Sequence, residues 1–218
     1  MAITPGPGES DAGSWRVEPF TRFIGRLDAA MGRQRERPRF LAVDGRSAGG
    51  KTTIARRLQD ALPSAAVVHT DDIAWNHSFF EWTDILVQHV LEPLRAGADV
   101  SYRPDAWAAH GRAGGIDVGA AELVIVEGVG SSQQALASQF DATIWVRSDF
   151  AEAERRGLIR DGGDAAAAAF WQEWMEAETP FLADDRPWER ATVIVAGTPD
   201  LPYDPVTEIV VAGRRRPV

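Results

Sequence analysis

Residues 40–53 read Phe-Leu-Ala-Val-Asp-Gly-Arg-Ser-Ala-Gly-Gly-Lys-Thr-Thr. Within this stretch, the residues from Gly45 to Thr52 match the pattern G-x-x-x-x-G-K-[ST], which is typical of a phosphate-binding P-loop. Glycine residues let the backbone turn so that successive N–H groups face a single anion. The helix expected to begin near Gly50 adds the positive end of its dipole at the same point. We therefore predict that this segment binds the phosphates of a nucleoside triphosphate.

The residues on either side of the P-loop support this interpretation. Residues 39–43 are an apolar run suited to a buried strand, and residues 51–62 place apolar side chains at helical spacing. In such a loop, Lys51 reaches the β- and γ-phosphates, and the hydroxyl of Thr52 holds Mg²⁺. A glycine-rich turn without chemical function is the alternative. The candidate nucleotide-binding residues are Gly45, Arg46, Ser47, Ala48, Gly49, Gly50, Lys51, Thr52 and Thr53.

The composition limits the partners of the chain. The length of 218 residues suits one α/β domain with a complete core. A formal net charge of −9 argues against general nucleic-acid binding, because contacts to phosphate backbones need a basic face. The absence of cysteine excludes disulfides and thiolate metal sites. No segment approaches ~18 consecutive apolar residues, so we expect no membrane partner.

The first residues differ in composition from the rest. Residues 1–14 are rich in glycine and proline, and they lack the basic and then apolar order of a signal peptide. We interpret them as a disordered leader and expect a cytoplasmic location. Residues 15–218 are expected to form a single domain.

Short apolar strands alternate with helical patterns along this domain. The expected strands are 65–69, 123–126, 143–146 and 192–195, with an edge strand at 205–212; the expected helices are 15–36, 83–96 with a kink at Pro93, 150–161 and 165–183. Residues 99–118 suggest a hairpin-like excursion. This order predicts an α/β fold, a doubly wound parallel sheet of the P-loop NTPase type flanked by helices, with a helical lid at about 150–186. Ligands bind at the carboxyl ends of such strands, which carry Gly45, Asp71 and Glu127.

The remaining motifs distinguish between kinds of P-loop protein. A GTPase would need an N-K-x-D stretch, but the only asparagine is Asn76, which His77 follows, and no D-x-x-G occurs. An L-S-G-G-Q-like signature of ABC ATPases is also absent. A small-molecule kinase needs a P-loop, a carboxylate that accepts the proton of the hydroxyl, a second acidic group for Mg²⁺ and mobile arginines. The chain contains candidates for each of these parts.

Two pairs of charged residues are those candidates. Asp71 and Asp72 come just past the predicted strand 65–69, where one can act as the base and the other as a metal ligand; an N-cap or a solvated turn is the alternative. Arg156 and Arg160 lie four residues apart on a predicted helix, so both guanidinium groups can face a transferring phosphate. Plain surface arginines are the alternative there.

Taken together, four segments resemble the superfamily of uridine kinase, phosphoribulokinase and pantothenate kinase. They are the P-loop, residues 69–75 (His-Thr-Asp-Asp-Ile-Ala-Trp), residues 126–128 (Val-Glu-Gly) and residues 155–161 (Arg-Arg-Gly-Leu-Ile-Arg-Asp). The likeness is greatest to uridine kinase-like ATP-binding proteins of high-GC bacteria. It implies that Asp71 accepts the proton, that Glu127 contacts Mg²⁺ or substrate, and that Arg156 and Arg160 belong to the lid. The aromatic pair of the family's base motif is replaced here by Ile73-Ala74.

Aromatic and charged residues form the candidate acceptor site. Residues 102–107 resemble a Y-x-x-Y-D-W-like stretch of the same group, and Arg103 and Asp105 suit a polyhydroxylated or charged acceptor. Burial of the lid helix is an equally good explanation for its tryptophans. The candidate substrate-binding residues are Asp71, Trp75, Phe80, Arg103, Asp105, Trp107, Glu127 and Trp174; the candidate metal ligands are Thr52, Asp72 and Glu127.

These observations predict an ATP- and Mg²⁺-dependent kinase that phosphorylates a hydroxyl of a small molecule. The acceptor is expected to be a nucleoside-like, sugar-like or antibiotic alcohol. The alternative is a nucleotide-binding regulatory protein that is recognised by a partner, in which Asp71→Asn would leave function intact. Assembly into a homodimer is compatible with the sequence.

Overall fold

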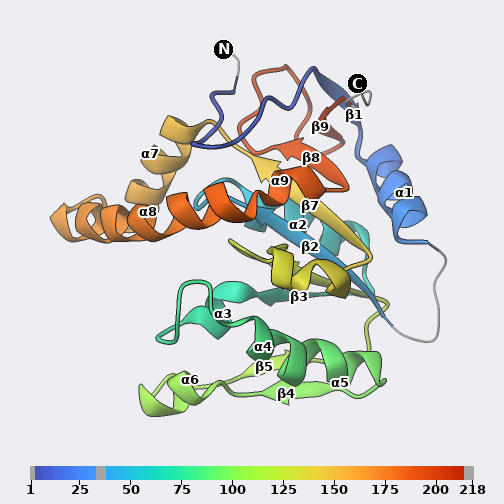
Figure 1. Ribbon diagram of the computed structural model, residues 1–218. Coiled ribbons are helices and arrows are strands. Elements are labelled where there is room, and N and C mark those ends of the chain that lie inside the picture. The colour runs from blue at the N-terminus through green and yellow to red at the C-terminus, as the bar shows by residue number, and fades with distance from the viewer. Residues whose placement is uncertain (1–2, 33–37, 214–218) are drawn as a thin grey trace.

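The computed structural model describes residues 3–32 and 38–213, and a seven-stranded sheet forms its centre (Figure 1). The strand order is β1 (Trp15–Pro19), β9 (Glu208–Ala212), β8 (Val193–Ala196), β7 (Ala142–Arg147), β2 (Arg39–Gly45), β6 (Leu123–Glu127) and β3 (Ala65–His69). The five strands from β8 to β3 are parallel. β9 runs antiparallel to both of its neighbours. The predicted α/β class with a mostly parallel, doubly wound sheet is confirmed.

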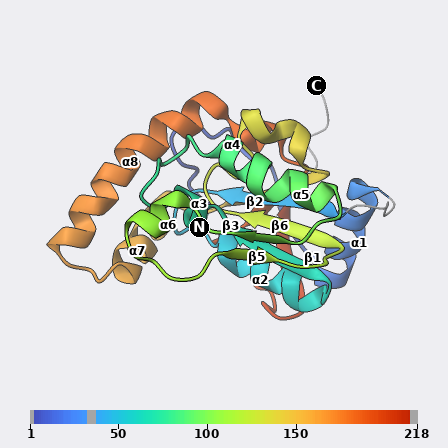
Figure 2. The ribbon, with the colours of Figure 1, turned by 90° about the horizontal axis from the view of Figure 1, so that it is seen from below.

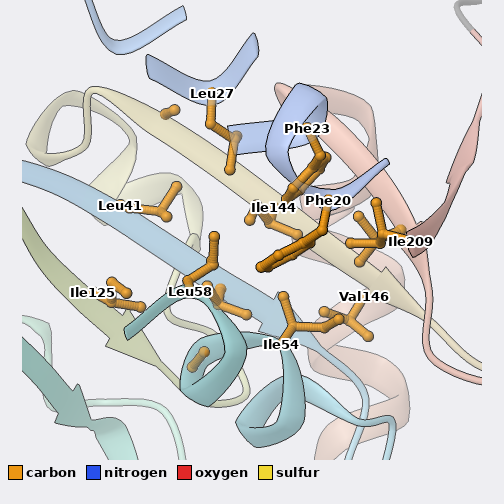
Figure 3. Close-up of a cluster of buried hydrophobic side chains, with 14 of the residues drawn as sticks. Phe20, Phe23, Leu27, Leu41, Ile54, Leu58, Ile125, Ile144, Val146 and Ile209 are labelled. Carbon is orange, nitrogen blue, oxygen red and sulfur yellow. The ribbon is translucent and has the colours of Figure 1, made fainter. Parts of the chain in front are cut away.

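Helices cover both faces of this sheet. On one face lie α1 (Phe20–Met31) and α2 (Lys51–Ala61); on the other lie α4 (Thr83–Leu86), the π-helix η1 (Val87–Leu91) and α5 (Glu92–Arg95) (Figure 2). Figure 3 shows how Phe20 and Phe23 of α1 and Ile54 of α2 meet the strand residues Ile144 and Val146. The central strands β6 and β7 are buried at almost every position, so their sequences are mainly apolar rather than alternating.

The remaining elements connect the strands of the sheet. They are α3 (Thr70–Ala74), the ribbon β4 (Val100–Tyr102) and β5 (Ile116–Val118) with α6 (Asp105–Ala109) between its strands, the 3₁₀-helix η2 (Gln134–Gln139), α7 (Phe150–Arg160), α8 (Ala165–Asp185) and α9 (Pro187–Arg190). The expected excursion at 99–118 is thus an antiparallel ribbon that contains a helix. α7 and α8 lie side by side and extend beyond the sheet (Figures 1 and 2).

Three predictions about the ends of the chain are wrong. Residues 15–19 form strand β1 rather than the start of a helix, and Pro19 is tolerated because β1 is an edge strand. Strand β9, expected at the edge, lies inside the sheet because β1 pairs with it. Residues 3–14, expected to be disordered, pack on the domain through the buried side chain of Glu9. The predicted helical residues 33–36 lie outside the described part of the chain.

The helix expected at 83–96 is interrupted by a wider turn. Pro93 has no N–H to donate to the carbonyl of His89, and the residues immediately before it form the π-helical turn of η1. The disruption expected at Pro93 therefore takes this form. Separately, no helix in the described ranges combines the length and apolar character that a membrane crossing requires.

Candidate active site at the carboxyl edge of the sheet

The P-loop joins β2 to α2, and its backbone conformation requires small residues. Gly45 has φ +156°, and a Cβ there would lie 2.5 Å from the carbonyl oxygen of Val146. Gly50 has φ +95°. Ala48 adopts a left-handed conformation with φ +55°, which is strained for a residue with a side chain. The loop therefore follows a fixed path in front of α2, and within it the amide of Gly49 donates a hydrogen bond of 3.0 Å to the carbonyl oxygen of Arg46.

Lys51 is the first residue of α2 and is buried. Its Nζ donates a hydrogen bond of 2.9 Å to the carbonyl oxygen of Arg46. The lysine thus connects the seventh residue of the loop to its second. This arrangement holds a positive charge beside the P-loop amides, where the phosphates of a nucleotide are expected.

Glu127 connects the P-loop to the neighbouring strands. It ends β6, and its Oε1 accepts a hydrogen bond of 3.0 Å from the hydroxyl of Thr52. Nδ1 of His69, at the end of β3, lies 2.6 Å from Oε2. Burial by itself would raise the pKa of Glu127, but His69 and the charge of Lys51 lower that pKa below its usual value. The same hydrogen bond raises the pKa of His69 against the opposing effect of its burial.

A cavity of about 570 Å³ opens in front of these groups. It brings together the P-loop, the end of β6, helix α3 and helices α7 and α8. Its lining residues are Ser47, Ala48, Gly49, Gly50, Lys51, Thr52, Thr70, Asp71, Ala74, Trp75, Asn76, Phe79, Glu127, Val129, Arg160, Phe170, Trp171, Glu173 and Trp174. A phosphate-binding loop, carboxylates and a guanidinium group therefore share one concave site.

Aromatic rings form another part of the cavity wall. Trp174 of α8 packs edge-on against Phe79, with ring centroids 4.8 Å apart. Phe80, predicted to contact substrate, lies behind this wall, because its ring stacks on Phe181 at 3.9 Å. Trp171 fills the contact between α8 and α7, where a Cβ on Gly157 would lie 2.1 Å from its ring. Trp75 and Trp174 are thus the two predicted aromatic residues that reach the cavity.

The two neighbouring aspartates have different surroundings. Asp71 is exposed and lines the cavity. Asp72, predicted as a metal ligand, does not line it, because its carboxylate accepts a hydrogen bond from Arg112. On a helix, adjacent residues point about 100° apart, so only one of two successive carboxylates faces the same partner. The structure therefore separates Asp71 from Asp72.

The two lid arginines are also separated. Arg160 lines the cavity and pairs with Asp161. Arg156 does not line it; its Nη1 donates a hydrogen bond of 3.2 Å to the carbonyl oxygen of Gly197, and its Nε pairs with Glu152. A Cβ on Gly197 would lie 1.9 Å from the carbonyl oxygen of Gly49, so Arg156 lies next to the P-loop.

Arg103, Asp105 and Trp107, predicted to bind the acceptor, lie outside the cavity lining. Trp107 is buried, and its indole N–H donates a hydrogen bond of 2.7 Å to the carbonyl oxygen of Asp72. The guanidinium of Arg112 stacks on its ring at 3.5 Å. Arg103 donates to the carbonyl oxygen of Arg112. Through Trp107 and Arg112, the segment around α6 therefore contacts α3 at Asp72.

Two of the predicted nucleotide-binding side chains point elsewhere. Arg46 is buried, and its Nε pairs with Glu9 at 2.7 Å while its Nη2 donates to the carbonyl oxygen of Pro7. Thr53 is exposed on α2 and does not line the cavity. Gly45 lies at the base of the loop, also outside the lining. At these three positions only backbone atoms can contact a bound nucleotide.

Asp44, which precedes the P-loop, is a structural residue that sequence reasoning missed. Its Oδ1 accepts hydrogen bonds from the amides of Gly45 and Gly130, and its Oδ2 accepts from the amide and hydroxyl of Ser132. Burial raises the pKa of Asp44, and the hydrogen bonds from Ser132 and Gly45 oppose that rise. The sequence signal that could have indicated this role is a charged residue at the end of an apolar strand.

Replacing Asp44 with alanine is expected to lower the free energy of unfolding by about 3–5 kcal/mol, because buried donors lose their acceptor. Urea denaturation measures this change, and Asp60→Ala, on the exposed face of α2, is the control expected to change it by less than about 0.5 kcal/mol. A loss below about 1 kcal/mol in Asp44→Ala would show that the network contributes little.

The residues around Thr52 and Glu127 fit a magnesium ion. Mg²⁺ prefers oxygen ligands and usually takes one or two from the protein and the others from phosphates and water. Thr52 and Glu127 provide two adjacent oxygens in front of the P-loop. In residues 3–32 and 38–213, no group of three or more histidine, cysteine, aspartate or glutamate side chains is arranged to hold a metal. With its other ligands from phosphates and water, Mg²⁺ could be held by these two oxygens.

Comparisons with known proteins show the fold. No family model and no curated protein sequence matches the chain. A solved structure of a possible uridine kinase from Bacillus stearothermophilus is 18% identical with a TM-score of 0.53, covering 80% of this chain and 97% of its own. A candidate fructose transport system kinase from Silicibacter sp. TM1040 is 22% identical with a TM-score of 0.53, covering 78% and 92% respectively. The likeness in fold extends over most of this chain and over nearly all of each of these two structures.

Proposed function

We propose that the chain is an ATP- and Mg²⁺-dependent phosphotransferase that phosphorylates a hydroxyl of a small molecule. The observation that carries the proposal is the single cavity lined by the P-loop, Asp71, Glu127 and Arg160. Phosphoryl transfer depends mainly on positioning and on neutralisation of charge, and these groups provide both. The fold shared with two proteins described as kinases supports the same conclusion.

The nucleotide end of the cavity binds and orients the triphosphate. Backbone N–H groups of the P-loop donate to its phosphates, and Lys51 neutralises their charge. Thr52 and Glu127 would hold Mg²⁺, which supplies a further positive charge to the phosphate oxygens. The lowered pKa of Glu127 keeps this carboxylate ionised, as a metal ligand must be.

The other end of the cavity binds the acceptor and removes its proton. Asp71 is exposed to the cavity and accepts the hydroxyl proton as that oxygen bonds to the γ-phosphorus. The bond from the γ-phosphorus to the β–γ bridging oxygen breaks at the same time, and ADP leaves with that oxygen. Arg160, at the end of α7, offers a guanidinium group to the transferring phosphate. Arg156 reaches the carbonyl of Gly197 beside the P-loop, which suits a contact with the nucleotide rather than with the acceptor.

The aromatic wall favours an acceptor with an apolar or flat face. Trp75, Phe79 and Trp174 offer ring surfaces, and Asp71 and Glu173 offer hydrogen-bond acceptors for hydroxyls. Nucleosides, sugars and hydroxylated antibiotics combine such faces with hydroxyl groups. We infer that the acceptor belongs to one of these three classes.

The proposal predicts ATP turnover that one class of acceptor stimulates. ADP release by the purified protein is measured with Mg²⁺ across panels of nucleosides, sugars and hydroxylated antibiotics, and the phosphorylated product is identified by mass spectrometry. We expect at least tenfold stimulation by one class, and loss of that stimulation when EDTA removes the Mg²⁺. Tight ATP binding without stimulation by any acceptor would instead favour a nucleotide-binding regulatory protein.

A further inference from the structure

Glu178 of α8 is a fully buried carboxylate that touches the P-loop. Its Oε2 accepts a hydrogen bond of 2.9 Å from the amide of Ser47 and another of 2.7 Å from the indole N–H of Trp174. Its Oε1 lies 3.7 Å from Nη1 of Arg46 and accepts no hydrogen bond within the described residues. One oxygen therefore joins a P-loop amide to a tryptophan side chain.

The two donors to Glu178 belong to different elements that line the cavity. Ser47 belongs to the P-loop wall, and Trp174 belongs to the aromatic wall, where it packs against Phe79. Because both bonds end on Oε2, a displacement of this oxygen changes the surroundings of both donors. Glu178 is thus the direct physical connection between the nucleotide end and the acceptor end of the site.

The carboxylate of Glu178 belongs to a buried cluster of charged side chains. Arg46 pairs with Glu9 through Nε, and Arg147 lies 2.9 Å from the other oxygen of Glu9. Glu9, Arg46, Arg147 and Glu178 are each at most 3% exposed. Two acids and two bases leave the cluster neutral, so the negative charge of Glu178 is compensated while it lies against Ser47.

A phosphate at the P-loop disturbs this balance. The P-loop amides are the donors for phosphate, and the amide of Ser47 is already bonded to a carboxylate. Two anions that approach the same donor in a site of low dielectric repel each other strongly. We propose that nucleotide phosphate displaces Glu178 from Ser47, and that Glu178 thereby moves Trp174 and couples nucleotide binding to the acceptor wall; this inference rests on the proposed nucleotide site.

The test follows Trp174 while ATP and Mg²⁺ are added. Tryptophan fluorescence of the wild type is compared with that of Trp174→Phe, and the difference reports on Trp174 among the eight tryptophans of the chain. Calorimetry gives the Kd of ATP independently. We expect the Trp174 difference signal to change in proportion to ATP bound in the wild type.

Glu178→Gln keeps the shape of the side chain and removes its charge. It is expected to bind ATP about fivefold more tightly, because one negative charge near the phosphates is lost. The Trp174 response to ATP is expected to disappear, because an amide is not repelled by phosphate. The matched control is Glu176→Gln, which removes the same charge from an exposed position of α8 and is expected to behave as the wild type.

Each outcome bears on the proposal. A Trp174 response in Glu178→Gln equal to that of the wild type would overturn it, as would wild-type ATP binding without any Trp174 response. The second result leaves the nucleotide site intact, whereas absence of ATP binding to the wild type removes the nucleotide site as well. Thermal melting checks that each variant is folded, and the wild-type signal tests the proposal by itself if Glu178→Gln does not fold.

Discussion

Replacing Asp71 with asparagine is expected to lower kcat by about 10²–10⁴-fold while the Kd of ATP changes little. The carboxylate of Asp71 lines the cavity and is exposed to it, so it can accept the hydroxyl proton as the new bond to phosphorus forms. Asparagine has a similar shape but cannot accept that proton at neutral pH. Steady-state kinetics with the acceptor found in the panel give kcat, and calorimetry gives the affinity for ATP.

Asp72→Asn is the matched control for this prediction. Asp72 lies next in sequence, carries the same charge and pairs with Arg112 outside the cavity lining. We expect kcat in Asp72→Asn to stay within about fivefold of the wild type, since this pair is partly exposed and contributes little. Equal losses in both variants, or a larger loss in Asp72→Asn, would assign the base to Asp72 and contradict the arrangement described above.

Replacing Lys51 with methionine is expected to weaken ATP binding and to reduce kcat/KM by about 10³-fold or more. The ammonium group of Lys51 lies beside the P-loop amides and is held by the carbonyl oxygen of Arg46. Methionine keeps the length and the apolar stem of the side chain and removes its charge. ATP titration by calorimetry and steady-state kinetics measure the two effects.

Arg56→Met provides the control for Lys51→Met. Arg56 lies on the same helix, loses one positive charge in the same way and is exposed. We expect its ATP affinity to equal that of the wild type within about twofold, because exposed charges are screened by solvent and salt. Loss of affinity in Arg56→Met as large as in Lys51→Met would mean that net charge, rather than the P-loop, governs binding.

The parts of the fold that depend on local sequence were predictable. The path of the P-loop follows from glycines at fixed spacing, and the central strands follow from short apolar runs, because both are determined by neighbouring residues. The meeting of Gly45, Asp71 and Glu127 at one edge also follows from the rule that parallel strands end together. Asp71 and Glu127 line the same cavity as the P-loop, as that rule predicts.

The parts that depend on distant residues were not predictable. Glu9 pairs with Arg46 across 37 positions in sequence, and Glu178 bonds to Ser47 across 131. No local pattern marks these partners, so residues 3–14 looked like a leader and Arg46 like a nucleotide-binding side chain. The buried cluster is visible only once the N-terminal segment and α8 are placed against the P-loop.

Side-chain direction explains the remaining differences. Arg103, Asp105 and Trp107 lie outside the cavity lining. Arg103 donates to Arg112 within the same excursion, and Trp107 donates to Asp72 of α3. Arg156 and Arg160 share a helix, yet one reaches Gly197 and the other reaches the cavity. Spacing along the sequence identifies which residues can act together, and tertiary packing decides which of them do.

The central claim is that this cavity transfers the γ-phosphoryl group of ATP to a hydroxyl. The most direct measurement uses ATP labelled in the γ-phosphate and separates labelled organic phosphate from labelled inorganic phosphate. We predict label in organic phosphate only when the acceptor is present, and almost none with Asp71→Asn. Label that stays in ATP or appears only as inorganic phosphate with every acceptor, in wild type and Asp71→Asn alike, would contradict the account.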